Sequence, residues 1–225
     1  MICKLTLGVA ILGLATGYAG TVFTTPTGLA PGTQYQLLFV TSDTSFATST
    51  NISDYNTFVT TEAALNSTLA AFDSANSVTW TVIGSTTAVN ADVNAPSSGL
   101  VYNLENTELA SSGVYGGTLL SPVGFDENGN SSSNNVWTGS TTSGTVAGGI
   151  NDLGQTFPEI GFANVATGSW IASGNGTFSN NGLSLYALSS VITVPQASTT
   201  PEPGTLGLTA CAALFLVSWR LRVKQ

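Results

Sequence analysis

The pattern of apolar and polar positions predicts a strand followed by an amphipathic helix in the first third of the chain. YQLLFVTS, residues 35–42, is rich in strand-forming residues and predicts a mostly buried strand. Through NISDYNTFVTTEAALNSTLAAFDS, residues 51–74, apolar residues recur at helical spacing. They are Ile52, Tyr55, Phe58, Val59, Leu65, Leu69 and Phe72. Asn51 or Ser53 can cap this helix, and its apolar stripe indicates core packing rather than a membrane or partner surface.

Beyond Asn76 the pattern changes to strand-like segments separated by polar loops. One such segment covers residues 183–194, and the others centre on aromatic residues. These are Trp80, Tyr102, Trp137 and Trp170. Two of the loops, residues 126–135 and 141–155, are longer than the connections usual in compact domains, so they are either a working surface or flexible. Residues 20–194 are therefore predicted to form one α+β domain.

Both ends of the chain differ from this polar middle. MICKLTLGVAILGLATGYAG begins with Lys4, continues with an apolar run and ends in small residues, which is typical of a cleaved secretory signal over residues 1–19. A buried core helix is the alternative for this short run. At the other end, residues 195–203 form a polar, Pro-bounded linker, residues 204–219 an apolar segment, and residues 220–225 a basic tail.

By its length, the apolar segment at residues 204–219 fits either a core helix or a membrane span. The basic residues that follow it favour a span whose carboxyl end lies inside the cell. With the Pro-Glu-Pro triplet before it, the tail resembles the PEP-CTERM sorting signal, the substrate of exosortases in Gram-negative bacteria. Besides the apolar helix, the matching residues are Pro201, Glu202, Pro203, Arg220, Arg222 and Lys224.

This resemblance implies a transient anchor in the inner membrane and recognition of the triplet by an exosortase-type membrane enzyme. It also implies delivery of the domain to the cell envelope, the cell surface or the outside, often alongside exopolysaccharide. A permanent single-span anchor and a buried terminal helix are the alternatives.

Charge placement limits what the exported domain can do. All four basic residues lie in the end segments, so residues 20–203 contain no Lys, Arg or His but all twelve carboxylates. Nucleic acid is excluded as a partner, because phosphate binding draws on Lys and Arg. Ser-His-Asp, Cys-His and Ser-Lys catalytic arrangements lack their base. The two cysteines, Cys3 and Cys211, also lie in the ends, which excludes a disulfide scaffold and a zinc–thiolate site.

The middle of the chain resembles secreted bacterial domains with a C-type-lectin-like fold. The matching pieces, between residues 35 and 190, are LLFVTS, DYNTFV, TWTVIGSTTAVNAD, GLVYNLENTELA, YGGTLLSPVGFDENGN and VWTGSTTSGT. The resemblance implies one α+β domain with a single main amphipathic helix, several antiparallel strands and long loops; a β-sandwich is the alternative. It transfers no sugar site, because the cysteine pairs and the Glu-Pro-Asn and Trp-Asn-Asp motifs of better-known lectins do not occur.

Calcium is the strongest hypothesis for a binding site. The loop DENGNSSSNN clusters the hard oxygen ligands that Ca²⁺ prefers, and its candidate ligands are Asp126, Glu127, Asn128 and Asn130. The loop is not an EF-hand, since its glycine is at the fourth position and Trp137 stands at the twelfth. An ordinary surface turn explains the same residues. Asp152 and Glu159 are further candidate ligands, which the sequence alone cannot bring together.

Other chemistry is less well supported by the sequence. Two carboxylates could hydrolyse a glycosidic bond, but no pair of acids stands out. An aromatic sugar platform is conceivable from the strand-like segments, although buried Trp and Tyr usually fill cores. Its candidates are Trp80, Tyr102, Trp137, Trp170 and Tyr186.

These observations predict a non-enzymatic exported protein of the cell surface or extracellular matrix. It would be processed by an exosortase-type system and linked to exopolysaccharide or biofilm. The alternative is a lectin-like module that binds polysaccharide with or without calcium. No cofactor other than Ca²⁺ is expected.

Overall fold

The computed structural model describes residues 21–196. The predicted signal at residues 1–19 and the sorting tail, with Pro201, Glu202, Pro203, Arg220, Arg222 and Lys224, lie outside the described residues. The chain divides between Val194 and Pro195 into two compact units, and the fold described below belongs to the first of them.

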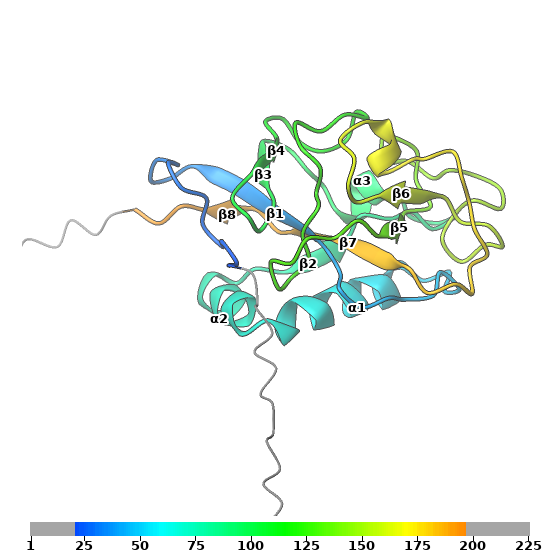
Figure 1. Cartoon of the computed structure of the whole chain (residues 1–225), viewed down its shortest axis with the longest axis horizontal. Helices are drawn as coiled ribbons and strands as arrows, with labels where there is room; N and C mark the ends of the chain where they lie inside the picture. Colours follow the sequence, from blue (N-terminus) through cyan, green and yellow to red (C-terminus); the bar gives the residue numbers. More distant parts are fainter. Residues whose placement is uncertain (1–20, 197–225) are drawn as a thin grey trace, which may run out of the picture. The chain divides into compact units, whose positions relative to one another are not determined.

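The first and the last but one of the strands lie side by side at the centre of a curled sheet (Figure 1). Its strands are β1 (Gln34–Val40), β2 (Trp80–Val82), β3 (Leu100–Tyr102), β4 (Glu108–Ala110), β5 (Asn135–Trp137), β6 (Ile160–Phe162), β7 (Ser184–Ser189) and β8 (Ile192–Thr193). They are ordered β4-β3-β1-β7-β5-β6, with β2 also paired to β7 and β8 to β1. The pairs β1–β3 and β5–β7 are parallel, and the other strand pairs are antiparallel.

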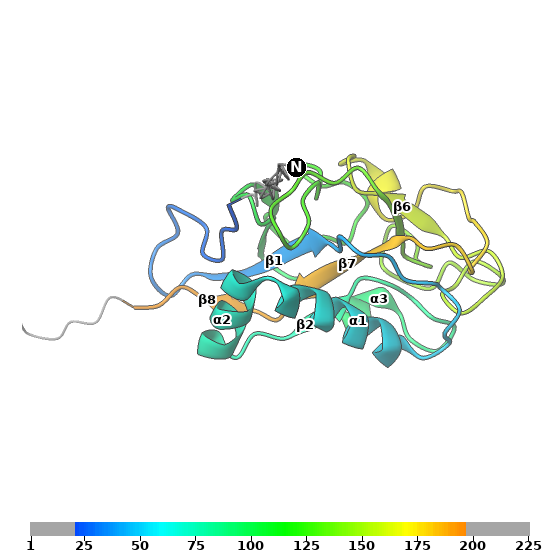
Figure 2. The ribbon, with the colours of Figure 1, turned by 60° about the horizontal axis from the view of Figure 1, so that its bottom comes forward.

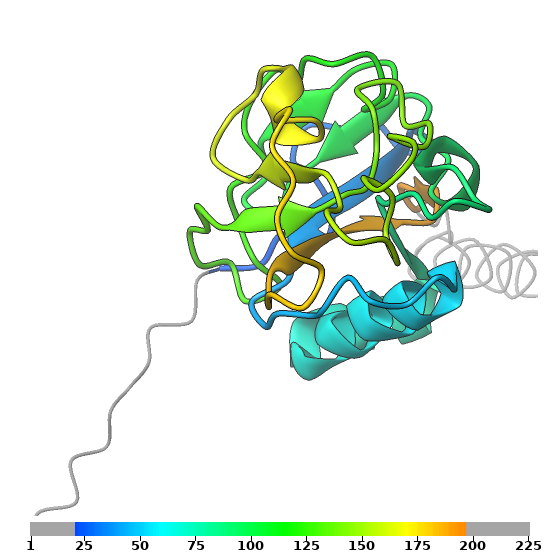
Figure 3. The same cartoon turned by 90° about the vertical axis from the view of Figure 1, so that its right-hand side faces the viewer.

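The two long helices cover one face of this sheet. The helical elements are α1 (Ile52–Leu65), α2 (Ser67–Asn76), α3 (Ala91–Asn94) and the 3₁₀ turn η1 (Gly168–Trp170). Figures 2 and 3 show α1 and α2 along the same side of β1 and β7, with the long loops between residues 110 and 180 gathered mostly on the other side. The described domain is therefore mixed α and β, with a multi-strand sheet and few helices.

Both faces of the central strands are buried. Along β1, Leu37 and Phe39 face α1 and α2, whereas Leu38 and Val40 belong to a second apolar cluster on the opposite face. Successive side chains of a strand point to opposite faces, so a strand covered on both sides needs the continuous apolar run that YQLLFV supplies. The predicted strand over residues 35–42 is confirmed within two residues at each end.

The predicted helix over residues 51–74 is two helices. Asn66 ends α1 in an extended conformation and begins α2, and its Oδ1 accepts the N–H groups of Thr68 at 2.9 Å and Leu69 at 3.1 Å. The capping side chain thus stabilises a break that the apolar spacing does not reveal. Leu65, predicted to face the core, is 65% exposed just before the break.

The strand predicted around Trp170 is the 3₁₀ turn η1 instead. The carbonyl oxygen of Trp170 lies against Gly161 of β6, where any Cβ would overlap it. The Tyr186 hydroxyl donates to the same carbonyl at 2.8 Å. These contacts place Trp170 against a face of the sheet and not within one of its strands. Its ring is fully buried.

The other strand predictions are confirmed at β2, β3, β5, β7 and β8, while β4, β6 and α3 were not predicted. Among residues 21–196 no helix has both the length and the apolar character needed to cross a membrane. The predicted spanning segment at residues 204–219 lies beyond this range.

Candidate binding site

The loop predicted to bind calcium is closed by hydrogen bonds among its own residues. Asp126 is 8% exposed, and its Oδ1 accepts the N–H groups of Asn128 at 2.9 Å and Asn130 at 2.8 Å. Its Oδ2 accepts the Asn130 side-chain amide at 3.3 Å. This is how an aspartate stabilises a tight turn, so the carboxylate has a structural role without any ion.

Glu127 is the second residue of that turn and is fully buried. Its carboxylate accepts the Ser42 N–H at 2.9 Å, the Ser42 hydroxyl, and the Asn128 side-chain amide at 2.8 Å. Burial raises the pKa of the Glu127 carboxyl, which the bonds from Ser42 oppose and nearby Asp126 reinforces. The carboxylate oxygens of Asp126 and Glu127 are therefore occupied by separate sets of hydrogen bonds within the protein. They do not form one shared site with free oxygens.

Glu62 of α1 is a second buried carboxyl in this region, at 4% exposure. Burial raises its pKa; the Asp43 N–H, which donates to Oε2 at 3.3 Å, opposes the shift, and the charges of Glu127 and Asp43 add to it. Residues 21–196 contain no Lys, Arg or His to neutralise the pair Glu62 and Glu127.

Asp152 and Glu159 share no hydrogen-bond partner with the 126–130 loop. Asp152 accepts the Gly148 N–H at 2.6 Å and the Thr87 hydroxyl at 3.2 Å. Within the described residues, no group of three or more His, Cys, Asp or Glu side chains is placed to hold a metal ion. Calcium binding at the loop stays a prediction.

A pocket of about 340 Å³ lies beside Glu159, and we call it the Glu159 pocket. It is lined by Ser140, Thr141, Thr142, Ala147, Asn151, Glu159, Ala172 and Gly174. The backbone of Glu159 is fixed where β5 and β6 meet, because its carbonyl accepts the N–H groups of Thr138 at 3.1 Å and Gly139 at 3.0 Å. The sheet edge thereby positions the carboxyl at the wall of the pocket.

Several polar groups of the Glu159 pocket are not engaged elsewhere. Glu159 is 8% exposed, and its Oε1 accepts the Gly174 N–H at 2.7 Å and the Ser173 hydroxyl at 3.3 Å. The other carboxylate oxygen, the Thr142 hydroxyl and the Asn151 side-chain amide make no hydrogen bond with another residue of the described range. An acceptor, a hydroxyl and an amide in one pocket can together bind a ligand rich in hydroxyl groups.

An aromatic pair lies on the two chain segments that bring Glu159 and Gly174 to this pocket. Glu159 bridges Gly176 in antiparallel fashion, and the Ser179 N–H donates to the Thr156 carbonyl at 3.2 Å, which sets Phe157 opposite Phe178. The two rings lie 4.3 Å apart between centroids at 42°, and Phe178 is 56% exposed. Phe157 stands at a bend two residues before Glu159, and Phe178 two residues after Gly176.

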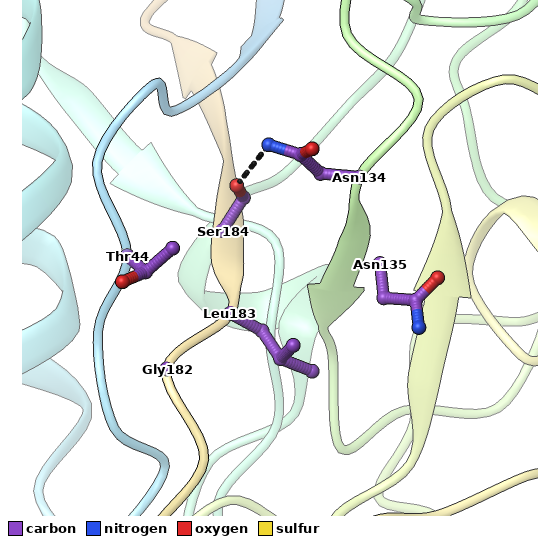
Figure 4. A pocket seen from close by; sticks show the side chains of 6 residues that line it. All are labelled: Thr44, Asn134, Asn135, Gly182, Leu183 and Ser184. Atoms are coloured by element: carbon purple, nitrogen blue, oxygen red, sulfur yellow. Dashed lines mark hydrogen bonds between the residues drawn. The ribbon is translucent and has the colours of Figure 1, made fainter.

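Two other hollows are smaller. One, of about 210 Å³, is lined by Thr44, Asn134, Asn135, Gly182, Leu183 and Ser184. Figure 4 shows Asn134 reaching Ser184 across it, where the amide donates to the hydroxyl at 2.9 Å. The other, of about 260 Å³, lies where β7 gives way to β8 and includes Gln36, whose amide donates to the carbonyls of Pro96 and Ser189. In both, a polar side chain is already bonded within the protein.

The hypothetical platform of strand aromatics is not at the surface. Trp80, Trp137, Trp170 and Tyr186 are buried in the two apolar clusters, and Tyr102 packs half-buried against one of them. Sequence reasoning therefore missed the pair of Phe157 and Phe178, in which Phe178 is exposed and Phe157 half-buried. The signal in the sequence was the Thr-Phe dipeptide at residues 156–157 and again at 177–178, each within a polar loop.

No family model and no curated protein matches this chain.

Proposed function

We propose that this protein is exported, sorted by an exosortase-type enzyme, and serves at the cell surface or in the extracellular matrix by binding or structure rather than catalysis. The observation that supports this most is the division of the chain after Val194. A folded acidic domain ends there, and the Pro-Glu-Pro triplet, apolar segment and basic tail follow it in order. An arrangement of this kind suits a domain that is held briefly at the inner membrane and then released.

A C-type-lectin-like arrangement is part of this proposal. The helices α1 and α2 follow β1 directly, and β1 pairs with the last strands, β7 and β8. One hydrogen-bonded sheet with helices on one face favours this fold over a β-sandwich, which would need two stacked sheets.

A non-enzymatic role fits the chemistry of the domain. Residues 21–196 have no His, Lys or Cys, so a nucleophile would lack an activating base. The buried acids Glu62 and Glu127 are bonded to neighbouring backbone and side chains, and neither lines a pocket described above. These features support a surface that binds or packs, and the exopolysaccharide of the matrix is its proposed partner.

Polysaccharide binding is the second candidate function. The Glu159 pocket and the exposed ring of Phe178 favour it, because they place polar groups and an aromatic side chain together outside the core. Calcium dependence remains open to test at Asp126, Glu127, Asn128 and Asn130.

The sorting proposal is tested by following the full chain in a Gram-negative host that encodes an exosortase. We expect the domain in the envelope or the medium when the exosortase is present, and in the inner membrane when its gene is deleted. Glu202→Ala should cause the same retention, whereas Glu105→Ala, in a turn of the exported domain, should not. Identical location and size in all four samples would rule out exosortase sorting.

A further inference from the structure

We propose that the Glu159 pocket, together with Phe157 and Phe178, binds a neutral, hydroxyl-rich glycan directly and without a bridging cation, and that the domain rejects acidic polysaccharides. This inference rests on the polysaccharide-binding function proposed above and names its site and its class of ligand.

The polar groups of the pocket match sugar hydroxyls. A carboxylate oxygen of Glu159 can accept a hydrogen bond from a hydroxyl, the Asn151 amide can both donate and accept, and Thr142 can do either. Glu159 is held in place by the Gly174 N–H and the Ser173 hydroxyl, so little side-chain freedom is lost on binding. Three polar groups that can bond to sugar hydroxyls directly need no metal ion between protein and sugar.

The aromatic pair gives such a ligand an apolar surface. Sugars have apolar C–H faces as well as hydroxyls, and an exposed ring on the segments that carry Glu159 and Gly174 can cover such a face. Phe178 lies against Phe157, with ring centroids 4.3 Å apart. The N–H groups of its neighbours Thr177 and Ser179 donate to the carbonyls of Pro158 at 3.4 Å and Thr156 at 3.2 Å, which holds the two segments together. Phe178 is thus a positioned ring with more than half of its surface exposed.

Charge decides which glycan can approach. Of the twelve carboxylates, Glu202 lies in the tail, which leaves eleven in residues 21–196 with no positive side chain among them. A uronate or sulfated polymer would meet repulsion on every side, with no Lys or Arg to pair its charges. A neutral polymer meets no such penalty, and a pocket of about 340 Å³ suits a short stretch of it.

The test is calorimetry or affinity gel electrophoresis with the purified exported domain in its folded form. The probes are neutral polymers, namely dextran, galactomannan and xylan, and acidic polymers, namely alginate and polygalacturonate, each with Ca²⁺ and with EDTA. We expect at least one neutral polymer to bind equally in Ca²⁺ and EDTA, and neither acidic polymer to bind at low salt.

Variants locate the site. Asn151→Ala removes an amide and Thr142→Val a hydroxyl, and neither group bonds to another residue of the described range, so the fold should persist and affinity should fall about 2- to 10-fold each. Phe178→Ala should weaken binding by about 10-fold. The matched controls are Asn135→Ala in the hollow of Figure 4 and Leu120→Ala at another exposed apolar residue, and both should bind as the unaltered domain does.

Three results would overturn the inference while leaving polysaccharide binding intact. They are binding of an acidic polymer as tight as that of a neutral one, loss of neutral binding in EDTA, and weakening by Asn135→Ala rather than Asn151→Ala. If no polymer of either class binds, the polysaccharide-binding function fails with it. Exosortase sorting is tested separately by location and mass, so its failure is distinguishable from either outcome.

Discussion

The indole N–H of Trp80 donates a hydrogen bond of 2.7 Å to Oδ2 of Asp73, and this bond joins α2 to β2. The other oxygen of the carboxylate, Oδ1, is buried without a partner among the described residues. Trp80 also packs edge-on against Phe39 of β1, with centroids 4.9 Å apart. One acceptor therefore fixes an aromatic side chain on which the helix-facing core depends.

Removing that acceptor should destabilise the domain. Asp73→Ala leaves the Trp80 N–H buried and unpaired, which should lower the free energy of unfolding by about 1–3 kcal/mol. Asp73→Asn keeps an acceptor and removes a buried charge, so we expect it to stay within about 1 kcal/mol of the unaltered domain. Urea unfolding followed by tryptophan fluorescence measures both. Equal losses in the two variants would show that the hydrogen bond is not what holds Trp80.

Stability should fall as the pH rises from mildly acidic to alkaline. Burial raises the pKa of Glu62, Asp73 and Glu127. A carboxyl whose pKa is higher in the folded than in the unfolded state holds its proton more tightly when folded, so its contribution is lost as the pH rises through the folded pKa. Repulsion among the acids adds in the same direction. We therefore expect the midpoint of thermal unfolding to be higher at about pH 5 than at about pH 8.

Glu62→Gln should reduce this pH dependence. The amide oxygen of the glutamine can still accept the Asp43 N–H, while the charge facing Glu127 and Asp43 is removed. We expect the variant to gain stability at about pH 8 relative to the unaltered domain, and Glu105→Gln, in a turn, to change little. A variant whose unfolding midpoint depends on pH as steeply as the unaltered domain would contradict the role given to Glu62.

The helix break depends on the side chain of Asn66. Asn66→Ala removes the acceptor of the Thr68 and Leu69 N–H groups and should cost about 0.5–2 kcal/mol, whereas Ser67→Ala, at an exposed neighbour with no side-chain bond to described residues, should cost little. Chemical unfolding monitored by circular dichroism compares the two. Equal effects at both positions would mean that packing rather than capping defines the break.

The elements that sequence reasoning found are those whose local pattern reflects their surroundings. β1 and β7 are buried on both faces, so they appear as continuous apolar runs, and α1 with α2 appears as helical spacing. The break at Asn66 was missed because the spacing continues across it and asparagine is common in either setting. Trp170 was misassigned because its 3₁₀ turn depends on contacts with Gly161 and Tyr186. Both residues lie outside the short stretch of sequence on which a strand prediction is based.

The candidate site was harder to predict than the fold for the same reason. The Glu159 pocket joins residues of the 141–155 loop to Glu159 and Gly174, and the Phe157–Phe178 pair depends on pairing between two loops. The pocket has no local motif, and the two Thr-Phe dipeptides do not reveal that their loops pair. The 126–130 loop had a suggestive composition, yet its aspartate is used to close a turn.

Replacing Asp126 separates the turn from the predicted calcium site. Asp126→Ala loses two backbone bonds to a charged acceptor and should lower stability by about 1–3 kcal/mol in EDTA as well as in Ca²⁺. Asp43→Ala, at an exposed acid nearby, is the control. Thermal unfolding in the two buffers measures the effect. A penalty confined to the Ca²⁺ buffer, with an unaltered domain that Ca²⁺ stabilises, would instead assign Asp126 to a metal site.

Intact-mass analysis of the protein purified from its native cells tests the central proposal most directly. Sorting and processing predict a mature chain that lacks the signal at residues 1–19 and the basic residues Arg220, Arg222 and Lys224. A mass that retains the sequence through Gln225 would contradict processing by an exosortase and favour a permanent anchor.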